Sequence, residues 1–172
     1  DSRFDIGQDN EELNSNSYLS YIILHQPSFL FNYTNIGYQS YYIDNQSVNL
    51  MKELLFDVHR IGNIKNNVEV TEPLIRNADI VTIDTSAFCA ADAPGVKYNS
   101  PNGFSSEDGC KMTRYAGLNP KLTSIGFFEY NPSCDVNDIT ANTISQMIWY
   151  FIEGFSLRMD DYPTQNSKDF KR

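Results

Sequence analysis

The sequence contains few of the residues from which most metal and disulfide sites are built. It has only two histidines, His25 and His59, and neither has a partner at the spacing of a metal-ligand pair. Its three cysteines, Cys89, Cys110 and Cys134, are too few and too irregularly spaced for a disulfide framework or a zinc site, so we expect reduced thiols. A glycine-rich phosphate loop, a CxxC pair and a Ser-His-Asp order are also missing, which argues against nucleotide-dependent and nucleophilic hydrolase chemistry.

Basic residues are scarce as well. Lysine and arginine total 13 against 22 aspartates and glutamates, for a formal charge of −9, which argues against a nucleic-acid or anionic-membrane surface. No apolar run approaches the roughly 20 residues of a membrane span, and the opening DSRFDIGQDNEE is neither a signal nor a transit peptide. We therefore expect a cytoplasmic protein whose partner is a small molecule or another protein.

The most informative stretch runs from residue 79 to residue 109. It opens with the short β-branched run 80–84, which predicts a strand buried on both faces and ending at Asp84. A long loop with Pro94-Gly95 follows, and then Ser105 and Asp108 stand at the spacing of a helix cap. An acidic residue at the carboxyl end of a parallel strand lies where open α/β sheets place their ligand sites.

The rest of the chain alternates between helical and extended patterns, which predicts an α/β fold with a parallel sheet and right-handed crossovers. Trp149 and Tyr150 flank the apolar stripe of the last predicted helix, where they could face another subunit or a further part of the sheet. Residues 59–64 fit a weak strand or a helix end equally well. We expect helices over 17–25, 46–60, 71–77, 105–115 and 135–158 and strands over 29–37, 80–84 and 122–128.

Several carboxylates coincide with predicted strand ends. Asp84 and Glu129 each end a strand, and Asp1 and Asp5 open the chain. Carboxylates gathered at one sheet edge repel each other unless a cation joins them, which makes a hard-metal site the first hypothesis. The alternative is that they are ordinary helix caps and loop acids.

Four segments then resemble motifs of the ureohydrolases, the family of arginase, agmatinase and formimidoylglutamase. Residues 84–95, DTSAFCAADAPG, resemble the family's second metal motif, DxDxxDPxxAPG, and 101–106, PNGFSS, resemble the PGGLS that follows it. Residues 128–132, FEYNP, resemble the later [ML]E[VY]NP motif, and 1–5, DSRFD, resemble DAHxD. The motifs occur in the family's order, so the resemblance covers most of the chain.

The resemblance implies a three-layer arginase-like α/β fold with a mainly parallel sheet and a dinuclear manganese centre, whose bridging hydroxide attacks a guanidinium or formimino carbon. Residues 1–160 would be the C-terminal part of a single domain, and 161–172 a polar tail. The N-terminal half of the fold would lie outside this sequence. We expect that half and further copies of the chain, in a homo-oligomer, as partners.

Carried over residue by residue, the metal motifs are only partly kept. Asp1, Asp5 and Asp84 retain carboxylate ligands, whereas Arg3 stands at the position of a ligand histidine and Ser86 at that of an aspartate. A guanidinium has no acceptor and a neutral hydroxyl is a poor substitute for a carboxylate. Both substitutions affect the same metal of the pair, so the resemblance implies that manganese is absent or present as a single ion. We expect the Arg3 guanidinium to project among the three carboxylates and pair with them.

Other positions of the resemblance concern the substrate. Glu129 corresponds to the residue that holds the substrate's guanidinium, and Tyr18 falls at the proton-shuttle position of the arginases. Cys89 and Ala90 replace the Asp-Pro at the end of the metal loop. The main hypothesis is a metal-depleted, non-catalytic protein with a structural, interaction or ligand-binding role, its ligand a small amidine or amino acid. The alternatives are an active manganese-dependent amidinohydrolase, agmatinase- or formimidoylglutamase-like, and a regulatory subunit.

Overall fold

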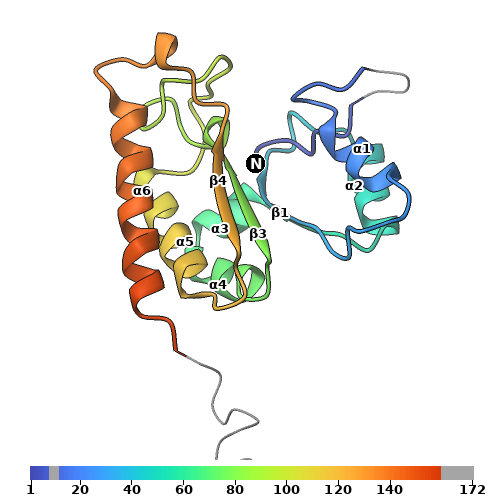
Figure 1. The fold of residues 1–172 in the computed structure, drawn as a ribbon. Coiled ribbons are helices and arrows are strands. Elements are labelled where there is room, and N and C mark those ends of the chain that lie inside the picture. Colours follow the sequence, from blue (N-terminus) through green and yellow to red (C-terminus); the bar gives the residue numbers. More distant parts are fainter. Residues whose placement is uncertain (8–11, 160–172) are drawn as a thin grey trace, which may run out of the picture.

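The structure is a computed structural model that describes residues 1–7 and 12–159. It forms two parts, each built around two parallel strands (Figure 1). The expected polar tail, 161–172, lies outside the described residues. None of the helices in the described part of the chain is long and apolar enough to cross a membrane.

The first part pairs strand β1 (Thr34–Tyr38) with β2 (Asp57–Arg60) and carries helices α1 (Tyr18–Leu24) and α2 (Asn45–Glu53). Phe4, Leu19 and Met51 form its buried core, with partly buried aromatic and aliphatic side chains packed around them. The segment before α1 therefore contributes to the packing of this part through Phe4.

The second part pairs β3 (Ile80–Asp84) with β4 (Ser124–Phe128) in parallel, and Asp84 lies opposite Phe128 at the carboxyl ends. Its helices are α3 (Ile61–Lys65), α4 (Thr71–Ile75), α5 (Ser106–Leu118) and α6 (Ile139–Ser156), with 3₁₀ turns at Val68–Val70, Thr85–Ala87 and Pro132–Cys134. Helix α5 packs against the long helix α6 (Figure 1).

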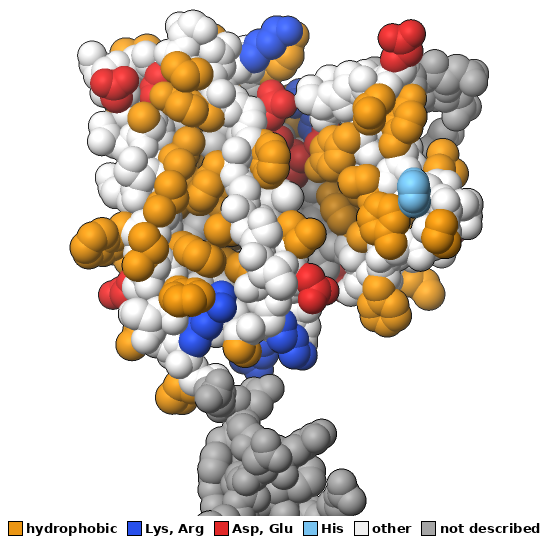
Figure 2. All heavy atoms as spheres, in the orientation of Figure 1, with side chains coloured by type: hydrophobic (Ala, Val, Ile, Leu, Met, Phe, Trp, Pro, Cys, Tyr) orange, Lys and Arg blue, Asp and Glu red, His pale blue; other side chains and the backbone are white. Residues whose placement is uncertain are grey.

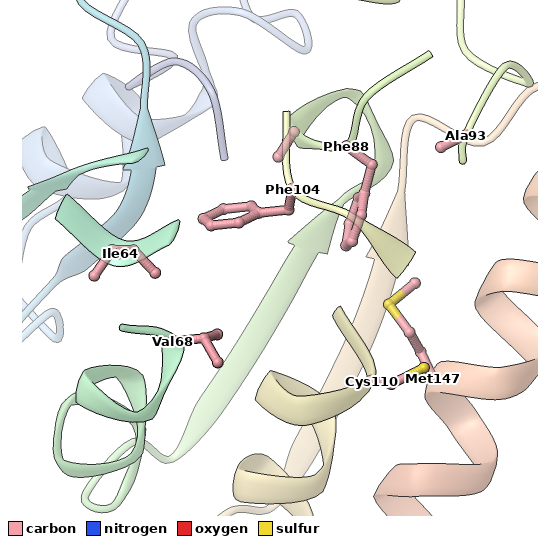
Figure 3. Close-up of a cluster of buried hydrophobic side chains, with 8 residues drawn as sticks. Ile64, Val68, Phe88, Ala93, Phe104, Cys110 and Met147 are labelled. Carbon is pink, nitrogen blue, oxygen red and sulfur yellow. The ribbon is translucent and has the colours of Figure 1, made fainter. Parts of the chain in front are cut away.

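The loop between β3 and α5 is locked into the core of the second part. Phe88 and Phe104 lie side by side in this core (Figure 3). Two backbone hydrogen bonds of 2.9 Å join their segments: the Cys89 N–H donates to the Phe104 carbonyl, and the Phe104 N–H donates to the Ala87 carbonyl. Gly103 allows the approach, because a Cβ there would lie 2.2 Å from the Phe88 carbonyl carbon. The residues just after Asp84 are thereby held in place.

The structure confirms several sequence predictions. β3 has the predicted bounds, both strand pairs are parallel, and Ser105 forms the predicted capping box with Asp108 at the start of α5. The Ser105 side chain accepts from the Asp108 N–H, and the Asp108 carboxylate accepts from the Ser105 N–H at 2.9 Å. Local capping and β-branched composition were sufficient signals here.

Two predictions were wrong. The helix expected over 46–60 ends at Glu53, because Leu55 adopts a positive φ of 59° and residues 57–60 pair with β1 as β2. Tertiary pairing therefore overrides a helical pattern. The run 80–84 is also not buried on both faces, since the Ile80 side chain is 64% exposed. Trp149 in α6, for which two packing partners were left open, is 72% exposed.

Candidate metal and ligand site

Three carboxylates from two distant segments meet beside the end of β3. One oxygen each of Asp1, Asp5 and Asp84 lies within 4.8 Å of the others. Asp84 is the last residue of β3, and its carboxylate accepts the Ser86 N–H at 2.7 Å, which orients it at the start of the following 3₁₀ turn. Three hard oxygen donors at this separation suit one divalent cation.

The segment 1–5 reaches this place because it lies along β1. The Asp1 nitrogen donates to the Ile36 carbonyl and the Gln39 N–H donates to the Ser2 carbonyl, each at 3.0 Å. The Asn35 side-chain amide donates to the Arg3 carbonyl at 2.8 Å. With Phe4 buried in the core, the backbone of this segment is fixed on both sides of Arg3.

The surroundings of Asp5 disfavour the ionised form of its carboxyl group. Its side chain is only 8% exposed, and burial, followed by the charge of Asp84, raises its pKa from 3.8 to about 6. Charges on the Asp1 nitrogen and Arg3 offset part of this shift. The cluster is therefore costly to ionise fully without a further cation.

Arg3 does not pair with the carboxylates as the sequence led us to expect. Its guanidinium carbon lies 4.3 Å from the centre of the Tyr42 ring, in a cation–π contact. Within the described residues, the structure has no ion pair between Arg3 and a carboxylate. The expectation failed because Tyr42 lies 39 residues from Arg3 along the chain, and no local pattern indicated that the two side chains would meet.

The family motifs provide for two ions, and the sequence predicted that at most one ion position is kept in this chain. Asp1, Asp5 and Asp84 can surround a single divalent ion such as Mn²⁺. The residues that the motif resemblance assigns to the second ion are Arg3, whose guanidinium cannot ligate, and the buried Ser86, whose hydroxyl is neutral. The donor set therefore suits one ion and not a pair.

A cavity of about 130 Å³ opens next to the cluster. Figure 2 shows acidic side chains inside the groove between the two parts of the chain. Glu129, with a positive φ of 62° directly after β4, is brought to this cavity together with Asp5 and Asp84. The lining consists of Arg3, Asp5, Ser15, Asn16, Asp84, Ser86, Val96, Lys97, Tyr98 and Glu129.

Sequence reasoning missed part of this lining. Lys97 and Tyr98 follow Pro94-Gly95 after a single residue, and Ser15 and Asn16 lie just before α1. Position after the Pro-Gly turn could have pointed to Lys97 and Tyr98, whereas nothing in the sequence marked Ser15 or Asn16. These four side chains reach the cavity only through the arrangement of the two parts.

Tyr18 and Cys89 are not among the residues that line the cavity. Tyr18 packs among the side chains around Leu19, and burial, then the nearby Tyr33, raises its pKa. A tyrosine that holds its proton this firmly is poorly suited to shuttle one near neutral pH. The Cys89 thiol donates to the Asp92 carboxylate at 3.4 Å, and burial is the main cause that raises the pKa of this thiol.

Comparison with known proteins decides the family. A sequence profile of the Arginase family matches residues 1–153. The chain belongs to the arginase family. The assignment to the ureohydrolase family is thereby confirmed. No curated protein matches this arginase-family chain.

Solved structures confirm the arginase-like α/β fold. A Mn²⁺ complex of Trypanosoma cruzi formiminoglutamase matches with a TM-score of 0.83 at 17% identity, covering 92% of this chain and 56% of that one. An arginase superfamily protein from the same organism matches with a TM-score of 0.83 at 17% identity, covering 92% of this chain and 55% of that one. Bacillus subtilis arginase matches with a TM-score of 0.61 at 21% identity, covering 69% of this chain and 43% of that one. The chain therefore spans about half the length of the structures it matches.

Proposed function

We propose that this arginase-family chain binds one divalent cation on Asp1, Asp5 and Asp84 and a small ligand in the adjacent cavity, without hydrolysing it. One observation carries the proposal: the two remaining positions of the metal motifs hold the Arg3 guanidinium and the Ser86 hydroxyl, and both side chains line the cavity. These two groups cannot complete the ligand set of a second metal ion. The N-terminal half of the fold, outside this sequence, would belong to the same domain.

The cation would supply the charge that the carboxylate cluster lacks. When bound, it would neutralise Asp1, Asp5 and Asp84 and polarise oxygen atoms brought next to it. Manganese is the ion present in the formiminoglutamase structure that the chain resembles. Glu129 and the basic side chains of Arg3 and Lys97 would orient the ligand from the cavity wall.

A second candidate is an amidinohydrolase that works with a single ion. It is favoured by the three gathered carboxylates together with Glu129, which faces the same cavity and could hold an amidinium group. The argument against it is proton transfer, because Tyr18 is not among the residues that line the cavity and its pKa is raised, mainly by burial. The two candidates differ in turnover and agree on metal content.

Metal content and product release test the proposal together. The chain is loaded with Mn²⁺, desalted and analysed by mass spectrometry for ions per chain, and then assayed for urea or formamide release from arginine, agmatine and formiminoglutamate. We expect one ion and no release. Asp84→Asn should abolish ion binding, while Asp57→Asn, at an exposed position of β2, should leave it unchanged. Two ions, or release that disappears in Asp84→Asn, would contradict the proposal.

A further inference from the structure

We propose that Arg3 binds the carboxylate of a small zwitterionic ligand in the cavity. The inference rests on the proposed single-ion site, and it names the chemical class of the ligand. It assigns Arg3 a binding role in place of the neutralising role that the sequence suggested.

The Arg3 side chain contacts the Tyr42 ring, and its guanidinium donates no hydrogen bond to any of the described residues. Its guanidinium carbon lies 4.3 Å from the centre of the Tyr42 ring, and this cation–π contact uses none of the five N–H donors of the group. Arg3 lines the cavity, and none of the described carboxylates lies within ion-pair distance of it. A planar fork with free donors in a cavity matches a carboxylate in two-point geometry.

The backbone of Arg3 is fixed independently of any ligand. The Arg3 N–H donates to the Asp1 carboxylate at 2.9 Å, and the Arg3 carbonyl accepts from the Asn35 amide at 2.8 Å. The neighbouring Phe4 is completely buried. The guanidinium therefore extends from a rigid base, so a ligand would lose little free energy in ordering it.

The charges around the cavity favour a ligand that carries both signs. The carboxylates of Asp5, Asp84 and Glu129 line the cavity together with the basic side chains of Arg3 and Lys97. A ligand that carries both signs can meet groups of opposite charge at both of its ends. Its carboxylate would bind Arg3, and its cationic end would face Glu129, for which the structure describes no basic partner.

The same charges disfavour a phosphate at Arg3. A phosphate carries more negative charge than a carboxylate and would lie beside the acidic cluster, where repulsion offsets its gain from the guanidinium. The cavity of about 130 Å³ also limits the ligand to a few non-hydrogen atoms. A short amino acid fits both conditions.

Calorimetry with four-carbon probes tests the inference on the Mn²⁺-loaded chain. The probes are 4-aminobutyrate, which has both charges, 1,4-diaminobutane, which lacks a carboxylate, and inorganic phosphate. We expect 4-aminobutyrate to bind most tightly. Arg3→Gln should weaken its binding about tenfold or more, as for a lost hydrogen bond between charged groups, and leave the diamine unchanged.

Two further variants keep the result interpretable. Arg60→Gln removes an exposed arginine at the end of β2 and should leave all three affinities unchanged. Arg3→Lys keeps the charge but loses the fork, so it should also weaken 4-aminobutyrate binding. If the circular dichroism spectrum of Arg3→Gln shows that this variant does not fold, Arg3→Lys takes its place in the binding experiment.

The inference is overturned if the Arg3 variants bind 4-aminobutyrate as the wild type does, if the diamine or phosphate binds more tightly, or if no probe binds. Ion content is measured on the same samples. Two ions per chain would contradict the proposed function, whatever the probes do. One ion with binding that does not depend on Arg3 would contradict this inference alone.

Discussion

The carboxylates of Asp5 and Asp84 lie within 4.8 Å of each other, although one belongs to the opening segment and the other ends β3. Asp5 is almost completely buried at this point, and Asp84 is the charge that contributes most to raising its pKa. The two parts of the chain therefore meet at an electrostatically unfavourable contact, which a bound cation would relieve.

The first prediction concerns pH and the metal-free chain. The folded state binds the Asp5 proton more tightly than the unfolded state does, because the pKa rises from 3.8 to about 6 on folding. The free energy of unfolding therefore includes a contribution from Asp5 that is fully present below about pH 4 and is lost as the pH rises through 6. This contribution is roughly 3 kcal/mol in total. About 1.4 kcal/mol of this falls between pH 5 and pH 8.

Urea unfolding in EDTA at pH 5 and pH 8 checks this prediction. Asp5→Asn should flatten the loss of unfolding free energy between the two pH values relative to the wild type. Asp57→Asn, at an exposed position of β2, is the matched control and should keep the wild-type dependence. An Asp5→Asn variant with the same pH dependence as the wild type would show that Asp5 does not carry the shift.

The second prediction concerns the lost ion position. The double variant Arg3→His and Ser86→Asp replaces a non-ligand and a poor ligand with an imidazole and a carboxylate. We expect the Mn²⁺ stoichiometry, measured by calorimetry, to rise from one ion per chain to two. Each single variant should remain at one ion. If the double variant also remains at one, these two positions do not determine the missing site.

The third prediction concerns the contact between α5 and α6. A Cβ at Gly154 would lie 2.2 Å from the Arg114 carbonyl oxygen, so Gly154→Ala must force the helices apart. We expect a loss of about 2 kcal/mol or more in unfolding free energy, measured by urea denaturation. Gly62→Ala in α3 is the control, because nothing lies within 4 Å of its Cβ position. It should be neutral or gain about 0.5 kcal/mol. Equal effects of the two variants would refute the close contact.

The fourth prediction concerns the start of α5. Ser105→Ala removes the side chain that accepts the Asp108 N–H, and this should cost about 1 kcal/mol in unfolding free energy. Ser145→Ala in α6 removes an exposed hydroxyl bonded only to its own helix and should change stability by less than about 0.5 kcal/mol. Urea denaturation of both variants provides the measurement. A Ser105→Ala variant as stable as the Ser145→Ala variant would show that the cap contributes nothing.

The sequence was most informative where the signal is local. The strand 80–84 and the cap formed by Ser105 and Asp108 follow from β-branched composition and from a spacing of three residues, and both are present. Residues 57–60 show the limit, because their helical pattern gives way to pairing with β1, a partner more than 20 residues earlier in the chain. Ile80 shows the same limit for burial, which depends on which elements cover the strand.

For the site, the sequence by itself determined the chemistry of the available groups. The carboxylates of Asp1, Asp5 and Asp84, and the unsuitability of Arg3 and Ser86 as ligands, follow from residue type at motif positions. Only the tertiary structure decided how these groups are used. It gathers the three carboxylates and opens the cavity toward Lys97, Tyr98 and Glu129. It also turns the Arg3 guanidinium onto Tyr42, because side-chain direction depends on neighbours brought close by folding.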